Sequence, residues 1–235
     1  MLLGIDFIYV FEVLIKLMKV VPYTLLIMLV SGIFGLILAI LILAIRLNKT
    51  KGLNMAVGIY LSFFRSTPVL IHLFLVYYGL PILLDKIGID ISSWSKSVFA
   101  VLSLTLFNGA YISEVLRPAY LAVEMGQHDA ADSIGLTKFK KLQRIIIPQM
   151  IPIVLPGLGN ALIDLIKDTS VLFVIGLVDI MGRAKLLIAN DYGVQKLEVY
   201  IAAGIIYWII IKIFNVIVSR FEEKYQLADN QNLSG

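Results

Sequence analysis

The sequence contains no cysteine and only two histidines, His72 and His128, among its 235 residues. The lack of cysteine excludes a disulfide framework, a thiol nucleophile and a thiolate zinc site, and two histidines are too few for a histidine-rich metal cluster. A phosphate-binding loop of the form G-x-x-x-x-G-K-[ST] is also absent, so the chain cannot hold a nucleotide by that route. We therefore expect neither a metal nor a cofactor in this chain.

Charged residues are scarce as well. Asp, Glu, Lys and Arg make up 15% of the residues, whereas 60% are hydrophobic. The mean hydropathy of +0.93 is far above the usual balance of a soluble domain. The net charge of +4 belongs to the loops of such a chain, and it is weak evidence for a nucleic-acid partner. These features predict an all-α integral membrane protein of one domain.

Five apolar runs are long enough to cross a hydrocarbon core of ~30 Å as helices. Aromatic residues gather at their ends, as membrane interfaces favour. No internal repeat relates the runs, and this argues against the inverted halves of many secondary transporters. The predicted spans cover residues 24–45, 55–78, 97–115, 149–167 (with a further apolar piece at 171–178) and 199–218.

The N-terminal segment, residues 1–21, is predicted to be an amphipathic helix at the membrane interface. Glu12, Lys16 and Lys19 follow one another at spacings of four and three and share one face, while the other positions are mostly apolar. The segment lacks the charged leading region and small-residue cleavage site of a signal peptide.

Lysine and arginine are distributed unequally between the two sides of the predicted spans. Ten lie on the side of the central loop, and five, or seven with Lys16 and Lys19, lie on the other. The richer side is cytoplasmic by the positive-inside rule. We therefore expect the N-terminus outside, and the loop 114–148 and the polar tail 221–235 in the cytoplasm. The ten are Arg46, Lys49, Lys51, Arg117, Lys138, Lys140, Lys141, Arg144, Arg220 and Lys224.

The central loop contains a spaced motif. It reads Asp129-Ala130-Ala131, three residues, Gly135, nine residues, Ile145, one residue, and Ile147-Pro148. Local chemistry predicts a short helix over 129–134 that Gly135 ends, since glycine favours the position after a helix. A solvated loop with an ordinary capped helix would fit equally well on these grounds alone.

The motif resembles the EAA loop of bacterial ATP-binding-cassette importer permeases, with Asp129 in place of Glu and Ile147 in place of Leu. The resemblance implies a type I importer-like transmembrane domain over residues 22–220 and no enzymatic activity in this chain. It implies that Asp129, Ala130, Ala131 and Gly135 couple the permease to separate ATPase subunits, which bind ATP and Mg. The other implied partners are a second permease copy or homologue and an extracytoplasmic solute-binding protein.

The resemblance covers about residues 20 to 220. Among importer permeases, the sequence is most similar in character to the polar amino acid permeases. It rests on residues 63–68 (FFRSTP), 74–81 (FLVYYGLP), 108–117 (NGAYISEVLR), 155–160 (LPGLGN) and 167–170 (KDTS). Ser66 departs from the glycine that is usual in that family. Among these proteins the general likeness is to cystine permeases, so an amino acid, with cystine favoured, is the expected substrate.

Several charged residues lie within or at the ends of the apolar runs, where an ionised group costs about 2.5–3.5 kcal/mol on insertion scales. Asp164, Lys167 and Asp168 share one helical face, so an internal ion pair is one interpretation. The other is that these groups line a substrate path. Asp164 and Asp168 could instead be the ion sites of an ion-coupled secondary transporter, which is the alternative function; a membrane scaffold would leave the charges unexplained.

An amino acid presents a carboxylate and an ammonium, so a path for it needs donors and acceptors. Arg65, Ser66 and Thr67 could meet the carboxylate, and Asn160, with Asp164 and Asp168, the ammonium. From Gln149, Asn160 lies about 16 Å along the helix, near the membrane midplane.

Three further expectations concern local structure. The prolines and glycines between 148 and 159 predict a non-uniform fourth helix. His72 is expected to be a packed polar residue rather than a ligand. Glu114 and Arg117, three residues apart, are expected to form a surface ion pair of little energetic weight.

Overall fold

The computed structural model describes residues 4–48 and 50–233, with side chains as far as Tyr225. The regular elements within these ranges are all helices, and the ranges contain no strand. The elements are α1 (Phe7–Met18), α2 (Val21–Leu47), α3 (Lys51–Ser66), α4 (Val69–Phe74), η1 (Leu75–Gly79), α5 (Leu80–Asp85), α6 (Lys96–Ala122), α7 (Met125–Ser133), α8 (Lys138–Lys141), η2 (Leu142–Ile146), α9 (Ile147–Asp168), η3 (Thr169–Ile175), α10 (Ile180–Asn190) and α11 (Lys196–Leu233).

The membrane-spanning helices match the five predicted spans in number, provided that one bent pair counts as a span. Four runs within the described residues are each long and apolar enough to cross a bilayer: α2, α6, the run from α8 to η3, and α11 to Tyr225. The fifth combines α3 with the segment Val69–Asp85. The prediction of an all-α membrane protein with five spans is thus confirmed.

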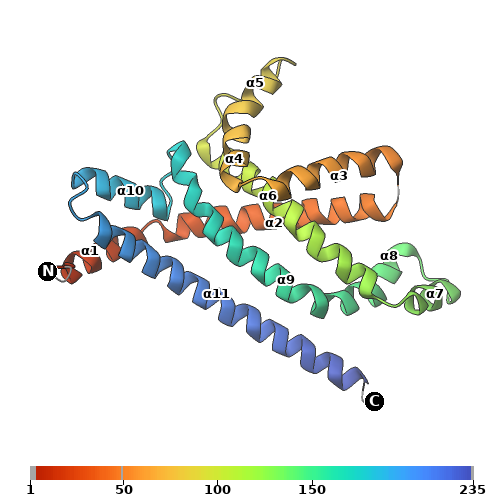
Figure 1. Ribbon diagram of the computed structural model, residues 1–235. Coiled ribbons are helices and arrows are strands. Elements are labelled where there is room, and N and C mark those ends of the chain that lie inside the picture. The colour runs from red at the N-terminus through yellow and green to blue at the C-terminus, as the bar shows by residue number, and fades with distance from the viewer. Residues whose placement is uncertain (1–3, 49, 234–235) are drawn as a thin grey trace.

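The second span is not the single helix expected over 55–78. It breaks between Ser66 and Val69, and its two halves meet at 118°. Thr67 is extended (φ −122°, ψ 149°) because the ring of Pro68 disfavours the helical region for the preceding residue. The Thr67 hydroxyl donates to the carbonyl of Phe63 at 2.8 Å and satisfies one acceptor at the broken end. Figure 1 shows α4 and α5 projecting from the bundle beyond this break.

Two turns of π-helix lie just before prolines. η1 ends two residues before Pro81 and η2 two residues before Pro148. Proline has no N–H to donate to the carbonyl four residues earlier, so the preceding turn widens into longer-range hydrogen bonds. The helix itself continues, and the expected fourth span of 149–167 is longer than predicted, running from Lys138 to Ile175. It is non-uniform, as expected.

The core of the bundle is formed by α2, α6, α9 and α11, with α2 lying along α6. Glycines on α9 allow its neighbours to approach closely. A Cβ at Gly157 would collide with Val115 on α6, and one at Gly159 would collide with Val218 on α11. Small residues at such points are typical of helix packing in membranes, where close backbone approach replaces the hydrophobic effect as the source of stability.

The N-terminal helix α1 is capped by Asp6, whose side chain accepts from the N–H groups of Ile8 and Tyr9, each at 3.0 Å. Its buried residues, Val10, Val13 and Leu17, belong to the same core as α10 and α11. The opposite side exposes further apolar residues, so α1 both packs on the bundle and presents an apolar surface. In Figure 1, α1 and α10 lie at one end of the molecule and α7 and α8 at the other. Those exposed residues are Phe7, Ile8, Phe11, Ile15 and Met18.

Candidate functional site

The central loop folds into the short helix α7, which begins earlier than predicted, at Met125. It ends in a Schellman motif: the N–H of Leu136 donates to the carbonyl of Ala131 at 3.1 Å, and that of Gly135 donates to Asp132 at 3.0 Å. Gly135 has φ +72°, a left-handed conformation that suits glycine. The expected short helix closed by Gly135 is therefore present.

The two alanines of the motif differ in their surroundings. Ala131 is fully buried within the chain, whereas Asp129 and Ala130 are exposed. Of the two alanines, only Ala130 is therefore available to a partner, whereas the small side chain of Ala131 lets α7 pack against the rest of the chain. The contact with the rest of the loop is strengthened by Lys141, which binds the carboxylate of Asp132 at 2.7 Å.

Sequence reasoning missed the apolar side chains that this loop exposes. Met125, Ile134 and Phe139 are 73%, 74% and 72% exposed. A polar loop with three exposed large apolar residues is typical of a protein-docking surface. The signal was available, because Ile134 and Phe139 are isolated apolar residues in a stretch rich in lysine and aspartate.

A stripe of exposed residues runs along α9 on the side away from α2. Gly32 of α2 faces Leu162 and Leu165, whereas Asn160, Asp164 and Lys167 lie on the opposite, exposed face. Lys167 binds Asp164 at 2.9 Å, which confirms that the expected internal pair forms. Asn160 has no side-chain hydrogen bond to any described residue. A membrane-spanning helix therefore presents an amide and an ion pair outside its own bundle.

Arg65 lies in an ionic cluster of three helices rather than alone. The carboxylate of Glu114 on α6 binds Arg46 at the end of α2 and Arg65 at the end of α3, the latter at 3.4 Å. The predicted pair of Glu114 with Arg117 is therefore wrong. Arg117 is exposed on another side of α6, and the partners of Glu114 come from elements that local spacing cannot reveal. About half of the Arg65 side chain remains exposed (48%).

Ser66 and Thr67 line an open groove of about 550 Å³ on the outer face of α3, together with Met55, Gly58, Ile59, Ser62 and Phe63. The Thr67 hydroxyl also bonds Nε2 of His72. His72 is fully buried and its ring stacks on Phe64 with centroids 4.4 Å apart. The interpretation of His72 as a packed residue is confirmed.

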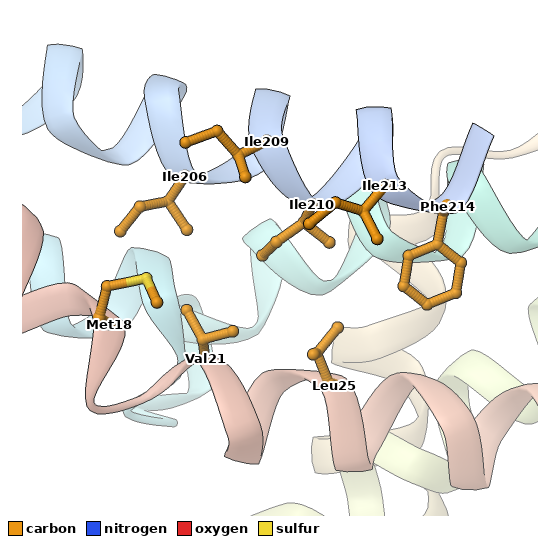
Figure 2. A pocket seen from close by; sticks show the side chains of 8 residues that line it. All are labelled: Met18, Val21, Leu25, Ile206, Ile209, Ile210, Ile213 and Phe214. Atoms are coloured by element: carbon orange, nitrogen blue, oxygen red, sulfur yellow. The ribbon is translucent and has the colours of Figure 1, made fainter. Parts of the chain in front are cut away.

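A second groove lies between the start of α2 and α11, with a volume of about 190 Å³ (Figure 2). It contains no polar side chain, so it offers nothing to the charged groups of an amino acid. Its lining residues are Met18, Val21, Leu25, Ile206, Ile209, Ile210, Ile213 and Phe214.

The predicted path residues thus fall into two sets. Arg65, Ser66 and Thr67 lie at the break after α3, while Asn160, Asp164 and Asp168 lie on α9. No hydrogen bond or ion pair joins the two sets within the part of the chain that the structure describes. Their roles remain predictions.

Asp179 is a buried carboxyl that sequence reasoning missed. It caps α10 by accepting from the N–H of Gly182 at 2.8 Å, and its side chain is wholly inaccessible. Burial disfavours the charged form and raises the pKa of Asp179 to about 6, although the hydrogen bonds from the backbone partly oppose this shift. An aspartate before an apolar run is the ordinary sign of a helix cap, and the sequence carries no sign of its burial.

Comparison with known proteins agrees with this architecture. The profile of the family described as "Binding-protein-dependent transport system inner membrane component" matches residues 31–226. The probable amino-acid permease protein YxeN of Bacillus subtilis is 34% identical over 93% of this chain and 95% of its own length. The L-cystine transport system permease protein TcyL of the same organism is 38% identical over 82% of this chain and 80% of its own.

A solved structure gives the same result. The crystal structure of an amino acid ABC transporter with histidines superposes with a TM-score of 0.80 at 27% identity, covering 94% of this chain and all of the matched one. Both the matched range and the relatives span most of the chain, so the family is established. The chain is a multi-pass membrane component of a transporter, not an enzyme, and it belongs to the family of binding-protein-dependent transport system inner membrane components.

Proposed function

We propose that this chain is the permease subunit of an ATP-driven importer that carries a polar L-amino acid into the cell, with cystine favoured. The observation that carries the proposal is the exposed stripe of Asn160, Asp164 and Lys167 on a membrane-spanning helix. Polar groups at that depth are too costly to leave in contact with lipid tails, so they face either protein or a water-filled path.

The stripe points away from its own bundle, so the second wall of the path must come from another molecule. We infer that a second copy of this chain, or a close homologue, supplies that wall and that the substrate passes between the two. Asn160 and the carboxylates of Asp164 and Asp168 are suited to the ammonium group. The half-exposed guanidinium of Arg65, with Ser66 and Thr67, is suited to the carboxylate.

Energy is supplied, in this proposal, by separate ATPase subunits that bind ATP and Mg and dock on the α7–α8 loop. The exposed Asp129 and Ala130, with the apolar Met125, Ile134 and Phe139, form the docking surface, and Gly135 fixes its shape. Exposed apolar residues at the centre with charges around them are usual at the core of protein interfaces. The similarity to TcyL supports cystine as the substrate.

The proposal is tested in proteoliposomes that contain the permease, its ATPase and its solute-binding protein. Cystine uptake should require ATP inside and should be inhibited by excess unlabelled cystine more strongly than by glutamine. Uptake that continues without ATP but follows an ion gradient would instead favour a secondary transporter that uses Asp164 and Asp168. Strong inhibition by another amino acid would change the assigned substrate, but it would leave the assignment as an ATP-driven importer unchanged.

The path is tested with Asn160→Ala and a matched control, Ile153→Ala, two turns earlier on the same exposed face. If Asn160 binds the ammonium group, its alanine variant should assemble normally and lose uptake, and its ATPase activity should no longer respond to substrate. The control should transport like the wild type. Unchanged uptake kinetics in the Asn160 variant would move the site to another residue, with Asp164 tested next.

The orientation is also part of the proposal: the N-terminus outside, and the α7–α8 loop and C-terminus in the cytoplasm. The chain has no native cysteine, so single cysteines report cleanly. A cysteine at Ser93 should react with an impermeant thiol reagent in intact cells, and one at Lys140 should not. The reverse pattern would invert the topology.

A further inference from the structure

The loop between α10 and α11 holds a tyrosine in a backbone conformation that tyrosine disfavours. Tyr192 has φ +53° and is the one non-glycine residue with positive φ in the described part of the chain. It occupies the position after the helix end where glycine normally stands, although a glycine, Gly193 with φ +78°, follows directly. A bulky side chain in the left-handed region is a genuine outlier.

The loop is held firmly at its base. The N–H of Tyr192 donates to the carbonyl of Ala189 at 3.2 Å, and that of Gly193 donates to Ile188 at 2.9 Å, which completes a Schellman motif. The carboxylate of Asp191 accepts from the hydroxyl of Tyr9 on α1. The conformation at the tip is therefore fixed by its neighbours and is present before any partner arrives.

The ring of Tyr192 is not packed against its own chain. Tyr192 is 96% exposed, and Val194, two residues later, is 83% exposed. Within the described residues, no burial of the ring offsets the cost of this backbone conformation. Strain of this kind persists where function maintains it.

The location of the loop tip, residues 191–195, limits which partners can contact it. It lies at the end of the molecule that holds α1 and α10, opposite the α7–α8 loop (Figure 1). It also precedes Lys196, the first residue of the membrane-spanning α11, so it lies outside the hydrocarbon. The proposed contact with a second copy runs along α9 within the membrane and leaves the tip free.

We propose that the tip formed by residues 191–195 is a docking contact for the extracytoplasmic solute-binding protein, with Tyr192 as its anchor and Val194 beside it. The inference rests on the proposed function, which supplies the partner and the orientation. Tyrosine is enriched among residues that carry binding energy, since it buries a large ring and its hydroxyl can still form a hydrogen bond. A loop fixed in advance also avoids the cost of ordering on binding.

The charges around the tip indicate the chemistry of the partner surface. Lys196 is exposed and forms no ion pair with any described residue, whereas the carboxylate of Asp191 is engaged by Tyr9. We infer a shallow apolar pocket for the ring on the binding protein, with a carboxylate at its rim opposite the exposed Lys196, because such complementarity orients the encounter.

The test compares Tyr192→Gly with Tyr192→Phe in the complete transporter, in nanodiscs, with purified cystine-loaded solute-binding protein as the titrant. Glycine accepts φ +53° without strain, so Tyr192→Gly should fold at least as well as the wild type, with an equal or higher Tm. We expect it to need about 10-fold or more binding protein for half-maximal stimulation of the ATPase. Tyr192→Phe should stay within about 3-fold of the wild type, and basal ATPase activity should be unchanged in both.

A photo-crosslinking residue at position 192 identifies the occupant directly. Crosslinking to the added solute-binding protein supports the inference, whereas crosslinking to a second permease copy or to lipid overturns it. Wild-type stimulation of the ATPase by the Tyr192→Gly variant would also overturn it. If the wild-type complex does not respond to the binding protein at all, the proposed function fails, and this outcome differs from every result that depends on the variant.

Discussion

Replacing Gly135 should separate ATP hydrolysis from transport. In the Schellman motif at the end of α7, Gly135 has φ +72°, and a Cβ built there would meet no atom within 4 Å. A side chain at this position therefore causes no collision, and its whole effect acts through the backbone. Gly135→Val is the strong perturbation, and Gly135→Asn is the matched control because asparagine tolerates the left-handed region.

The size of the effect follows from the geometry. A left-handed conformation costs an L-residue about 1–2 kcal/mol, and a β-branched side chain lies at the upper end of that range. If the chain escapes this cost by changing conformation, the carbonyls of Ala131 and Asp132 lose their partners, at about 0.5–1.5 kcal/mol each. The nine-residue α7 cannot resist such a change by itself, since short helices are marginal without packing.

The assay measures uptake and ATP hydrolysis in the same proteoliposomes. We expect Gly135→Val to insert normally and to lower the amount of substrate carried per ATP by ~5-fold or more, the population change that 1–2 kcal/mol produces. Gly135→Asn should stay close to the wild type. Equal coupling in the valine variant would show that the shape of this loop does not transmit the ATPase motion.

Two further predictions concern stability. Because the pKa of Asp179 is raised to about 6, the folded state binds a proton more tightly than the unfolded state, so stability falls as pH rises from about 4 to 6, by at most ~2–3 kcal/mol. Asp179→Asn keeps the acceptor for the helix cap and should raise Tm at pH 7 and remove this slope; an unchanged slope in thermal unfolding would contradict the assignment. Gly159→Ala should lower stability by about 1–3 kcal/mol because its methyl meets the stiff side chain of Val218, whereas Gly204→Ala, with nothing within 4 Å, should not. Equal Tm values for the two alanine variants would refute the close packing of α9 on α11.

The number of spans could be predicted because a bilayer leaves few solutions. A backbone without water must satisfy its own hydrogen bonds, so an uncharged apolar run such as that of α2 is bound to become a helix. The break at Pro68 could also have been predicted, since proline constrains the residue before it. Hydropathy does not detect such a break, because apolar residues continue on both sides of it.

The partners of charged residues could not be predicted from spacing. Glu114 has Arg117 within helical reach, yet it binds Arg46 and Arg65, which come from two other helices. Local spacing did predict the pair of Asp164 and Lys167, where both groups lie on one exposed face of a single helix. A short-range rule holds where a helix face is open and fails where helices converge.

The contrast between the Glu114 cluster and the Asp164–Lys167 pair bears on where the proposed substrate path lies. Charges that the chain can satisfy internally, such as the three in the Glu114 cluster, join helices within one molecule. The stripe on α9 is different, because Asn160 has no partner among the described residues and the ion pair beside it is exposed. In a membrane such a surface is stable only when something else covers it. The proposed path is thus incomplete in a single chain, and the residues assigned to it should be judged by their effect on transport in the assembled complex rather than on the stability of one subunit.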